Sequence, residues 1–214
     1  MGGPRVVTRR SLESSARRVA ARPVENVSYN GDLLPAISAE VRARFDIDPD
    51  ARPFESGQNS VVFVNGRGNV VSFMKRGAPS ALRKALKGGY SCLPKVFDVQ
   101  AVDLGGAGAA TAVEMERLEP LSKGDADDLT SLYDALHEGM SGEGTSPEEA
   151  SLSETARYLD PESDTPIERD LSDLFSRMLK EGVDHSDLVY NSGNLARDGE
   201  GRLKLLDFED VRVS

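Results

Sequence analysis

The chain has 214 residues, of which 38% are hydrophobic, and a formal net charge of −10. That length allows one domain or two small lobes with a buried core, so we expect a soluble globular protein. The negative charge argues against general nucleic-acid binding, because such binding depends on Lys and Arg side chains that neutralise phosphates. No apolar run approaches the ~20 residues of a membrane span, and the single cysteine excludes an intrachain disulfide.

The amino terminus is basic. Residues 1–22 carry six arginines against one acid, Glu13. We therefore predict that residues 1–30 form a basic arm, which is a frayed terminus, a docking arm or a targeting segment. Because the arm lacks the apolar core of a secretory signal, the expected location is cytoplasmic, with export into a host cell if the arm is a secretion signal.

Residues 31–119 are predicted to form a small sheet lobe preceded by a helix. Apolar residues between 33 and 45 recur mostly at three- and four-residue steps, which is typical of one face of a short helix. Asn65-Gly66 lies between the β-branched runs 61–64 and 70–74, and this pattern predicts a β-hairpin. Three further elements are expected in this lobe: a short basic helix at 79–86 and strands at 95–102 and 111–115.

Residues 120–214 are predicted to form a reduced helical lobe. Apolar residues from 129 to 140 lie on one helical stripe, whereas the polar stretch 141–164 predicts a solvated loop or a partly ordered insertion. Thr165-Pro166-Ile167-Glu168 predicts a capping box with proline at the first helical position. The helix that follows is expected to bury Ile167, Leu171, Leu174, Phe175, Met178 and Leu179.

Chemistry-bearing residues gather near the end of the chain. His185-Ser186-Asp187 is followed by Asn194-Leu195-Ala196, a predicted hairpin, and Leu205-Leu206-Asp207-Phe208. An Asp in a loop, an Asn, a hairpin and an Asp closing an apolar strand match what a kinase needs to position metal-bound phosphate. Over about residues 55–210 the chain resembles the protein-kinase-like superfamily. The resemblance implies a two-lobed minimal kinase-like fold of the α+β class, with a small antiparallel sheet lobe and a reduced helical lobe.

The resemblance also implies roles for the three polar residues of this segment. Asp187 would be the catalytic base, and Asn194 and Asp207 would hold Mg²⁺. Asn191 is the alternative metal ligand, because Asn194 follows Asp187 by seven residues where the family pattern has five. Two other interpretations stay open: Asp187 as a loop-capping residue, and Asp207 as the partner of an arginine such as Arg202 or Arg212.

On the nucleotide side, the resemblance places Lys75 on the phosphates of ATP and assigns Gly57 and Ser60 to the phosphate-covering turn. Glu116 and Leu118 would belong to the linker that binds adenine through its backbone. The alternative for Lys75 is a surface lysine at a strand end. No acid stands between Lys75 and Asp98, so the usual carboxylate partner of this lysine would have to come from a distant residue such as Glu40.

The predicted function is ATP- and Mg²⁺-dependent phosphoryl transfer to a Ser or Thr hydroxyl of a protein, by a monomer whose partners are ATP and that substrate. The sequence ends seven residues after Asp207, which resembles the minimal kinases of bacterial effectors and phages. One alternative is an inactive pseudokinase that binds a partner through the basic 75–95 face. Another is a small-molecule phosphotransferase.

Overall fold

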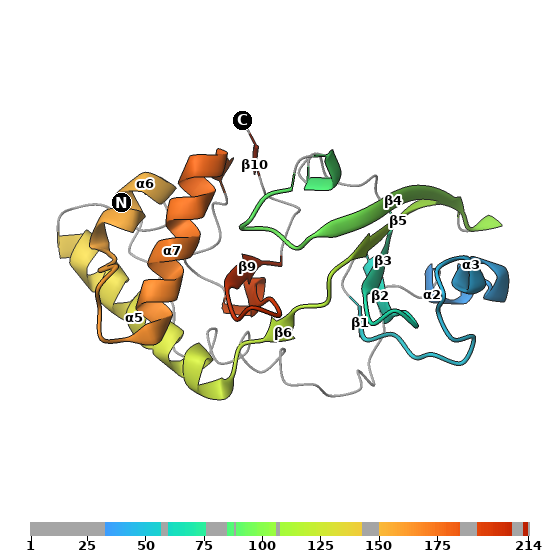
Figure 1. Cartoon of the computed structure of the whole chain (residues 1–214), viewed down its shortest axis with the longest axis horizontal. Helices are drawn as coiled ribbons and strands as arrows, with labels where there is room; N and C mark the ends of the chain where they lie inside the picture. The colour runs from blue at the N-terminus through green and yellow to red at the C-terminus, as the bar shows by residue number, and fades with distance from the viewer. Residues whose placement is uncertain are drawn as a thin grey trace, which may run out of the picture.

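The computed structural model describes residues 33–56, 60–75, 85–87, 89–105, 108–142, 150–184, 192–206 and 212–213. Its class is α+β, as expected: the helices α5 (Lys123–Gly142), α6 (Leu152–Thr155) and α7 (Pro166–Glu181) gather at one end of the molecule and the largest antiparallel sheet at the other (Figure 1). The largest sheet has five strands in the order β1-β2-β3-β5-β4. These strands are β1 (Glu55–Ser56), β2 (Ser60–Val64), β3 (Val70–Met74), β4 (Val96–Asp103) and β5 (Ala109–Met115).

The β2–β3 hairpin confirms the prediction made from Asn65-Gly66. The Asn65 side-chain oxygen accepts hydrogen bonds from the backbone N–H groups of Arg67 and Asn69, and its amide donates to Glu114 of β5. Asn69 and Arg67 also donate to the Glu114 carboxylate, which is 3% exposed. A buried carboxylate needs such donors, and here they all come from the turn, so the turn is fastened to the neighbouring strand.

Two short helices, α2 (Leu33–Ala36) and α3 (Ala39–Arg44), cover one face of this sheet (Figure 1). The sequence predicted a single helix here. The backbone is instead extended at Ser38, with φ −63° and ψ 164°, and the Ser38 hydroxyl accepts from the Val41 N–H as the N-cap of α3. The apolar residues still reach the sheet, and together they form the α2–α3 cluster: Leu33, Ile37, Phe45, Ile47, Val61, Phe63, Val71, Phe73, Val102, Leu104, Ala110 and Ala112.

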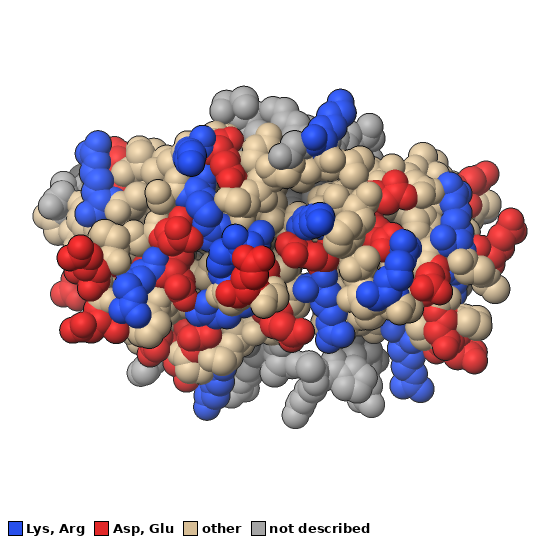
Figure 2. Space-filling view, viewed as in Figure 1, with Lys and Arg blue, Asp and Glu red and all other residues tan. Residues whose placement is uncertain are grey.

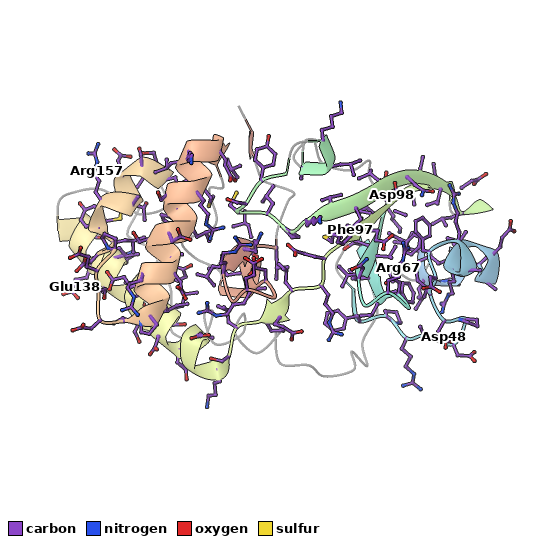
Figure 3. The ribbon with its side chains drawn as sticks, in the orientation of Figure 1. Asp48, Arg67, Phe97, Asp98, Glu138 and Arg157 are labelled. Carbon is purple, nitrogen blue, oxygen red and sulfur yellow. The ribbon has the colours of Figure 1, made fainter. Side chains whose placement is uncertain are left out.

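The edge of the sheet carries a β-bulge on strand β4. The register between β4 and β5 shifts between Val96 and Asp98, which leaves Phe97 at the irregularity with 42% of its surface exposed (Figure 3). Lys95 lies over its ring, with the ammonium 5.4 Å from the centroid. Bulges of this kind interrupt the row of free backbone groups that an edge strand would otherwise present.

The helical part contains α5 (Lys123–Gly142), α6 (Leu152–Thr155), the 3₁₀ turn η2 (Ala156–Tyr158) and α7 (Pro166–Glu181). The stretch predicted as a loop therefore holds a helix, and that prediction was wrong in part. Leu152 and Leu159 are 8% and 5% exposed because they pack with the buried face of α7, and Ser151 and Glu154 form a capping box. Figure 3 marks this end of the molecule with Glu138 on α5 and Arg157 on η2.

Helix α7 differs from its prediction in two details. Thr165 is the N-cap, but its side chain makes no capping hydrogen bond. The Glu168 carboxylate does not complete the capping box either, because it accepts from Asp160 N–H and the Ser163 hydroxyl. Leu179 is 45% exposed, so it does not belong to the buried face. The other five predicted residues, Ile167, Leu171, Leu174, Phe175 and Met178, are buried as expected.

One hydrophobic cluster joins the helices to the large sheet. It contains Val96, Val113 and Met115 from the sheet together with the buried faces of α5 and α7. Two short sheets lie beside it: β6 (Glu119–Pro120) with β8 (Leu195–Arg197) and β9 (Leu203–Leu205), and β7 (Val183–Asp184) with β10 (Arg212–Val213). Among the described helices, none is long and apolar enough to cross a membrane. On the face shown in Figure 2, acidic and basic side chains are interspersed.

Candidate functional site

The β8–β9 hairpin confirms the predicted order of an Asn, a hairpin and an apolar strand. The 3₁₀ turn η4 (Ser192–Asn194) leads into β8, and Leu195 pairs with Leu205 of β9. Beyond this pair, the Leu206 N–H donates to the Asn194 carbonyl at 2.7 Å. Leu206 immediately precedes Asp207 in the chain. The hairpin therefore holds Asn194 beside Leu206, one residue before Asp207.

The side chain of Asn194 is the most unusual polar group in this hairpin. The residue is 8% exposed, and its side-chain amide has no hydrogen-bond partner among the residues described. A buried amide needs a partner to offset its lost hydration, and residues 185–191 and 207–211, on either side of this hairpin in the chain, lie outside the described residues. An amide oxygen is a hard ligand of the kind that Mg²⁺ prefers, and the residue therefore fits the predicted metal role.

The tip of the hairpin is organised by Asp198. Its carboxylate accepts hydrogen bonds from the N–H groups of Glu200 and Arg202, at 3.0 and 2.9 Å, and from the Arg202 guanidinium. Burial alone would raise the pKa of Asp198, but the hydrogen bonds from Arg202 and Glu200 outweigh it and hold the pKa below its usual value. Arg202 is thus engaged within the hairpin, as the partner of Asp198 and Glu200.

The linker after β5 was predicted to bind adenine through its backbone. Glu116 continues the strand pairing, because its N–H donates to the Lys95 carbonyl at 2.9 Å and its carboxylate accepts from the Lys95 N–H at 2.8 Å. The Leu118 side chain is buried at 7% exposure. Within the described part of the chain, neither the Glu116 carbonyl nor the Leu118 N–H has a hydrogen-bond partner. The linker thus carries one acceptor and one donor, two residues apart, that make no hydrogen bond with a described residue, and this spacing suits a planar base.

A row of small and β-branched side chains crosses the sheet near this linker. Val62 pairs with Ser72, and Ser72 pairs with Val113, so the three residues lie side by side on neighbouring strands. Since successive residues of a strand point to opposite faces, this row lies on the face away from the α2–α3 cluster. At the start of β1, Phe54 lies under the Arg117 guanidinium, 5.3 Å from the ring centroid, which brings the first strand to the linker.

Lys75 follows directly after the last residue of β3, as predicted, and its side chain is exposed. It makes no ion pair with a described residue, and Glu40 on α3 is exposed as well. Phe73 packs in the α2–α3 cluster, whereas Met74 packs with the opposite face. A regular continuation of the strand would put Lys75 on the side of Phe73, away from the row formed by Val62, Ser72 and Val113.

Three of the predicted site residues, Gly57, Asp187 and Asp207, lie outside the described residues, as does the alternative ligand Asn191. Ser60 begins β2, is half-buried and pairs with Met74. The structure thus brings Asn194 to the mouth of the hairpin and Glu116 and Leu118 to the linker. It does not connect Lys75 with either of them.

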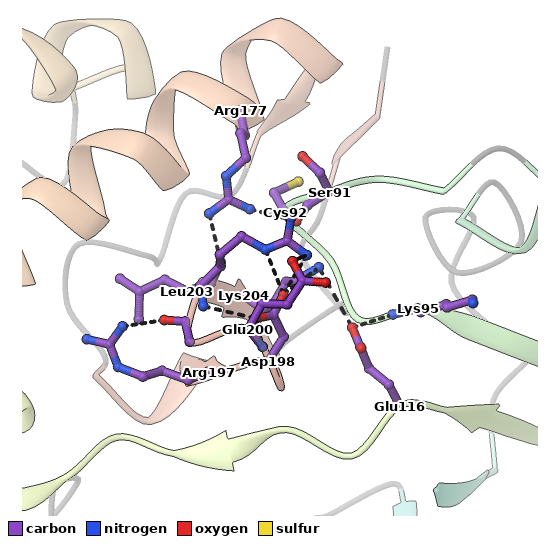
Figure 4. A network of polar contacts seen from close by, with 12 residues as sticks. Ser91, Cys92, Lys95, Glu116, Arg177, Arg197, Asp198, Glu200, Leu203 and Lys204 are labelled. Carbon is purple, nitrogen blue, oxygen red and sulfur yellow. Dashed lines mark hydrogen bonds and ion pairs between the residues drawn. The ribbon is translucent and has the colours of Figure 1, made fainter.

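Sequence reasoning missed Lys204, which lies in β9 with 5% exposure. Its ammonium is 3.3 Å from the Leu93 carbonyl, 3.5 Å from Asp198 Oδ2 and 3.7 Å from Glu116 Oε1 (Figure 4). The only signal available in the sequence was that this lysine stands between two leucines, both of them buried in the structure. Alternation in that strand gave no reason to expect a buried charge, because two of the three acceptors, Leu93 and Glu116, come from segments distant in the sequence.

A second connection ties α7 to the same region. Arg177 donates to the carbonyls of Ser91 and Leu203, at 2.6 and 2.9 Å (Figure 4). Glu181 accepts from the N–H groups of Ser91 and Cys92. Leu205 N–H also donates to the Cys92 carbonyl at 2.9 Å. Residues 91–93, β9 and the helix are consequently held as one unit.

Within the described ranges, no group of three or more His, Cys, Asp or Glu side chains is arranged to hold a metal ion. Of the two predicted metal ligands, Asp207 falls outside those ranges, as does the alternative ligand Asn191, so this finding concerns the remainder of the molecule. A scan of the chain against protein-family models finds no matching family, and a search of curated proteins finds no relative.

Proposed function

We propose that the protein is a minimal kinase-like phosphotransferase that transfers phosphate from ATP to a Ser or Thr hydroxyl of a protein, with Mg²⁺. The observation that carries the proposal is the hydrogen bond between Leu206 N–H and the Asn194 carbonyl. This bond places Asn194, whose buried side-chain amide has no partner among the described residues, beside Leu206, the residue that precedes Asp207. This is the arrangement expected of two metal ligands that approach one ion from neighbouring strands.

The fold is consistent with this proposal. A five-stranded antiparallel sheet precedes the linker, and helices followed by the β8–β9 hairpin come after it. Bound Mg²⁺·ATP would supply the phosphoryl group, with its charge shielded by the ion. Asn194 and Asp207 would hold the metal, the Glu116 carbonyl and Leu118 N–H would bind the base, and Asp187 would take the proton of the acceptor hydroxyl.

Nucleotide binding and phosphoryl transfer should be measured separately. Purified protein is titrated with a fluorescent ATP analogue with and without Mg²⁺, and then incubated with γ-labelled ATP and a panel of proteins and small hydroxyl compounds. Asn194→Ala and Asp207→Asn should abolish the Mg²⁺-dependent part of binding, and Asp187→Asn should abolish transfer while binding persists. Asp134→Asn, on the exposed side of α5, is the matched control.

Asn191→Ala decides between the two candidate asparagines, because only the true ligand should alter the Mg²⁺ dependence. Retention of both binding and transfer by Asp207→Asn would refute the assignment of the metal site. Transfer to the small compounds but not to proteins would instead support a small-molecule phosphotransferase.

A pseudokinase that acts as a binding module is the second candidate, and Lys75 favours it. The lysine that should contact the phosphates is exposed, has no carboxylate partner in the part of the chain described, and follows the strand on the side of Phe73. If this candidate is correct, Lys75→Met will leave nucleotide binding unchanged. A tenfold or greater loss of phosphoryl transfer in Lys75→Met, with Lys123→Met as control, would exclude it.

A further inference from the structure

Lys204 occupies a position where an apolar residue would be expected. Its neighbours in β9, Leu203 and Leu205, are 1% and 0% exposed and belong to the main hydrophobic cluster. An ammonium buried in such surroundings loses its hydration, and this cost is recovered only if the charge meets well-placed acceptors. Replacement by a hydrophobic residue of similar volume is often neutral or stabilising, so stability alone does not explain a lysine here.

The acceptors of Lys204 come from three separate segments. Leu93 belongs to the stretch before β4, Asp198 to the tip of the β8–β9 hairpin, and Glu116 to the linker after β5 (Figure 4). The two carboxylates are not equivalent, because the Asp198 side chain is 4% exposed and that of Glu116 is 26% exposed. Asp198 is also satisfied by the N–H groups of its own turn. Glu116 has one other described donor, the Lys95 N–H.

The contact with Glu116 reaches the part of the linker with open backbone groups. One oxygen of the Glu116 carboxylate, Oε1, accepts a hydrogen bond from Lys95 N–H at 2.8 Å and lies 3.7 Å from the Lys204 ammonium, as an ion pair. Two partners at this oxygen restrict the rotation of the Glu116 side chain, and the Glu116 carbonyl is one of the two groups that lack a described partner. Lys204 also lies three residues before Asp207 in the sequence.

We propose that Lys204 is a positioning residue for nucleotide binding. Its ammonium holds the Glu116 carboxylate, and thereby fixes the orientation of the linker backbone that would bind the base. Through β9 it also couples the linker to the strand that leads into Asp207. This inference rests on the proposed function, since it concerns the same nucleotide site, and it adds a residue that the resemblance to kinases did not provide.

The test compares Lys204→Met with Lys204→Arg, Glu116→Gln and the double variant Lys204→Met/Glu116→Gln. Lys180→Met, on the exposed surface of α7, is the matched control. Circular dichroism first establishes that each variant folds. Affinity for the fluorescent ATP analogue with Mg²⁺ is then measured, together with amide hydrogen exchange of residues 116–118 in the absence of nucleotide.

Lys204→Met and Glu116→Gln should each weaken nucleotide binding about tenfold, and the double variant should be no weaker than either single one, because both changes remove the same contact. Lys204→Arg retains the charge and should recover most of the affinity. Exchange of residues 116–118 should accelerate in Lys204→Met and stay unchanged in Lys180→Met. Should Lys204→Met fail to fold, Glu116→Gln and Lys204→Arg carry the same comparison.

Two results would overturn the inference. Wild-type affinity in both single variants, or losses that multiply in the double variant, would show that Lys204 does not act through Glu116. Failure of the wild-type protein to bind nucleotide would overturn the proposed function, and with it the role of Lys204 at this site. Faster exchange of residues 116–118 in Lys204→Met would in that case identify a purely structural tether.

Discussion

Replacing Asp198 by Asn removes the negative charge at the tip of the β8–β9 hairpin and keeps the shape of the side chain. In the wild type, the carboxylate accepts from the N–H groups of Glu200 and Arg202 at 3.0 and 2.9 Å, and the residue is 6% exposed. Hydrogen bonds to a charged acceptor contribute roughly 1.5–3 kcal/mol each and neutral ones roughly 1 kcal/mol. Loss of the charge therefore costs about 1 kcal/mol for each of these two bonds, about 2 kcal/mol together, and the loss of the ion pairs with Arg202 and the buried Lys204 adds to it.

Urea denaturation at pH 7 measures this loss directly, and thermal unfolding should show a decrease in Tm of at least about 4–8 °C, the share of the two backbone bonds in a chain of this length. The pH dependence gives an independent check. Because the folded pKa of Asp198 lies below its usual value of 3.8, its stabilisation is fully present above that value and is lost as the pH falls through the folded pKa. The difference between wild type and Asp198→Asn should thus shrink below about pH 4.

Glu200→Gln is the matched control for this prediction. Glu200 pairs with the same Arg202, but its side chain is 73% exposed, so its replacement should change the free energy of unfolding by less than about 0.5 kcal/mol. Equal effects of Asp198→Asn and Glu200→Gln would refute a stabilising role for the Asp198 charge at the hairpin tip. So would a stability difference between wild type and Asp198→Asn that persists unchanged to pH 2.

Three further predictions concern the helix α7 and the segment it contacts. Gly182→Ala should destabilise the protein by about 1 kcal/mol in urea denaturation, because Gly182 ends α7 in the left-handed region at φ 66°. Gly199→Ala is the control and should be nearly neutral, because a Cβ at this position meets open space. Glu181→Gln should reduce stability at pH 7, and this reduction should shrink as the pH falls below about 4.5. Burial would raise the pKa of Glu181, yet hydrogen bonds from Ser91 and Cys92 hold it below its usual value of 4.5, so the stabilisation is present above that value and is lost as the pH falls through the folded pKa. An unchanged difference at low pH would contradict this reasoning. Cys92 should resist alkylation by iodoacetamide at pH 8 in the native protein and react on unfolding. Burial and the neighbouring Glu181 carboxylate raise the pKa of its thiol. Rapid labelling of the native protein, detected by mass spectrometry, would contradict this prediction by showing that the thiol is accessible.

The sequence determined the elements whose signals are local. Asn65-Gly66 between two β-branched runs specified the β2–β3 hairpin, because the turn residues and the strand period both lie within about fifteen residues. The apolar face of α7 was likewise predicted from its period, and the proline at its first position agrees with the structure. The order of Asn194, hairpin and apolar strand was visible in the sequence for the same reason, since β8 and β9 are adjacent in the chain.

Tertiary structure decided what depends on contacts between distant segments. Leu179 satisfied the helical period but lies at the edge of the buried face, and Leu152 and Leu159 are buried because α7 lies against them. The Glu168 carboxylate was predicted to form part of a capping box, but it accepts hydrogen bonds from Asp160 N–H and the Ser163 hydroxyl instead.

The charge of Lys204 is tolerated in a hydrophobic cluster only because the backbone brings Leu93, Glu116 and Asp198 to it. The energy of a buried charge depends on which acceptors surround it, and pattern and propensity in the sequence carry no information about those acceptors.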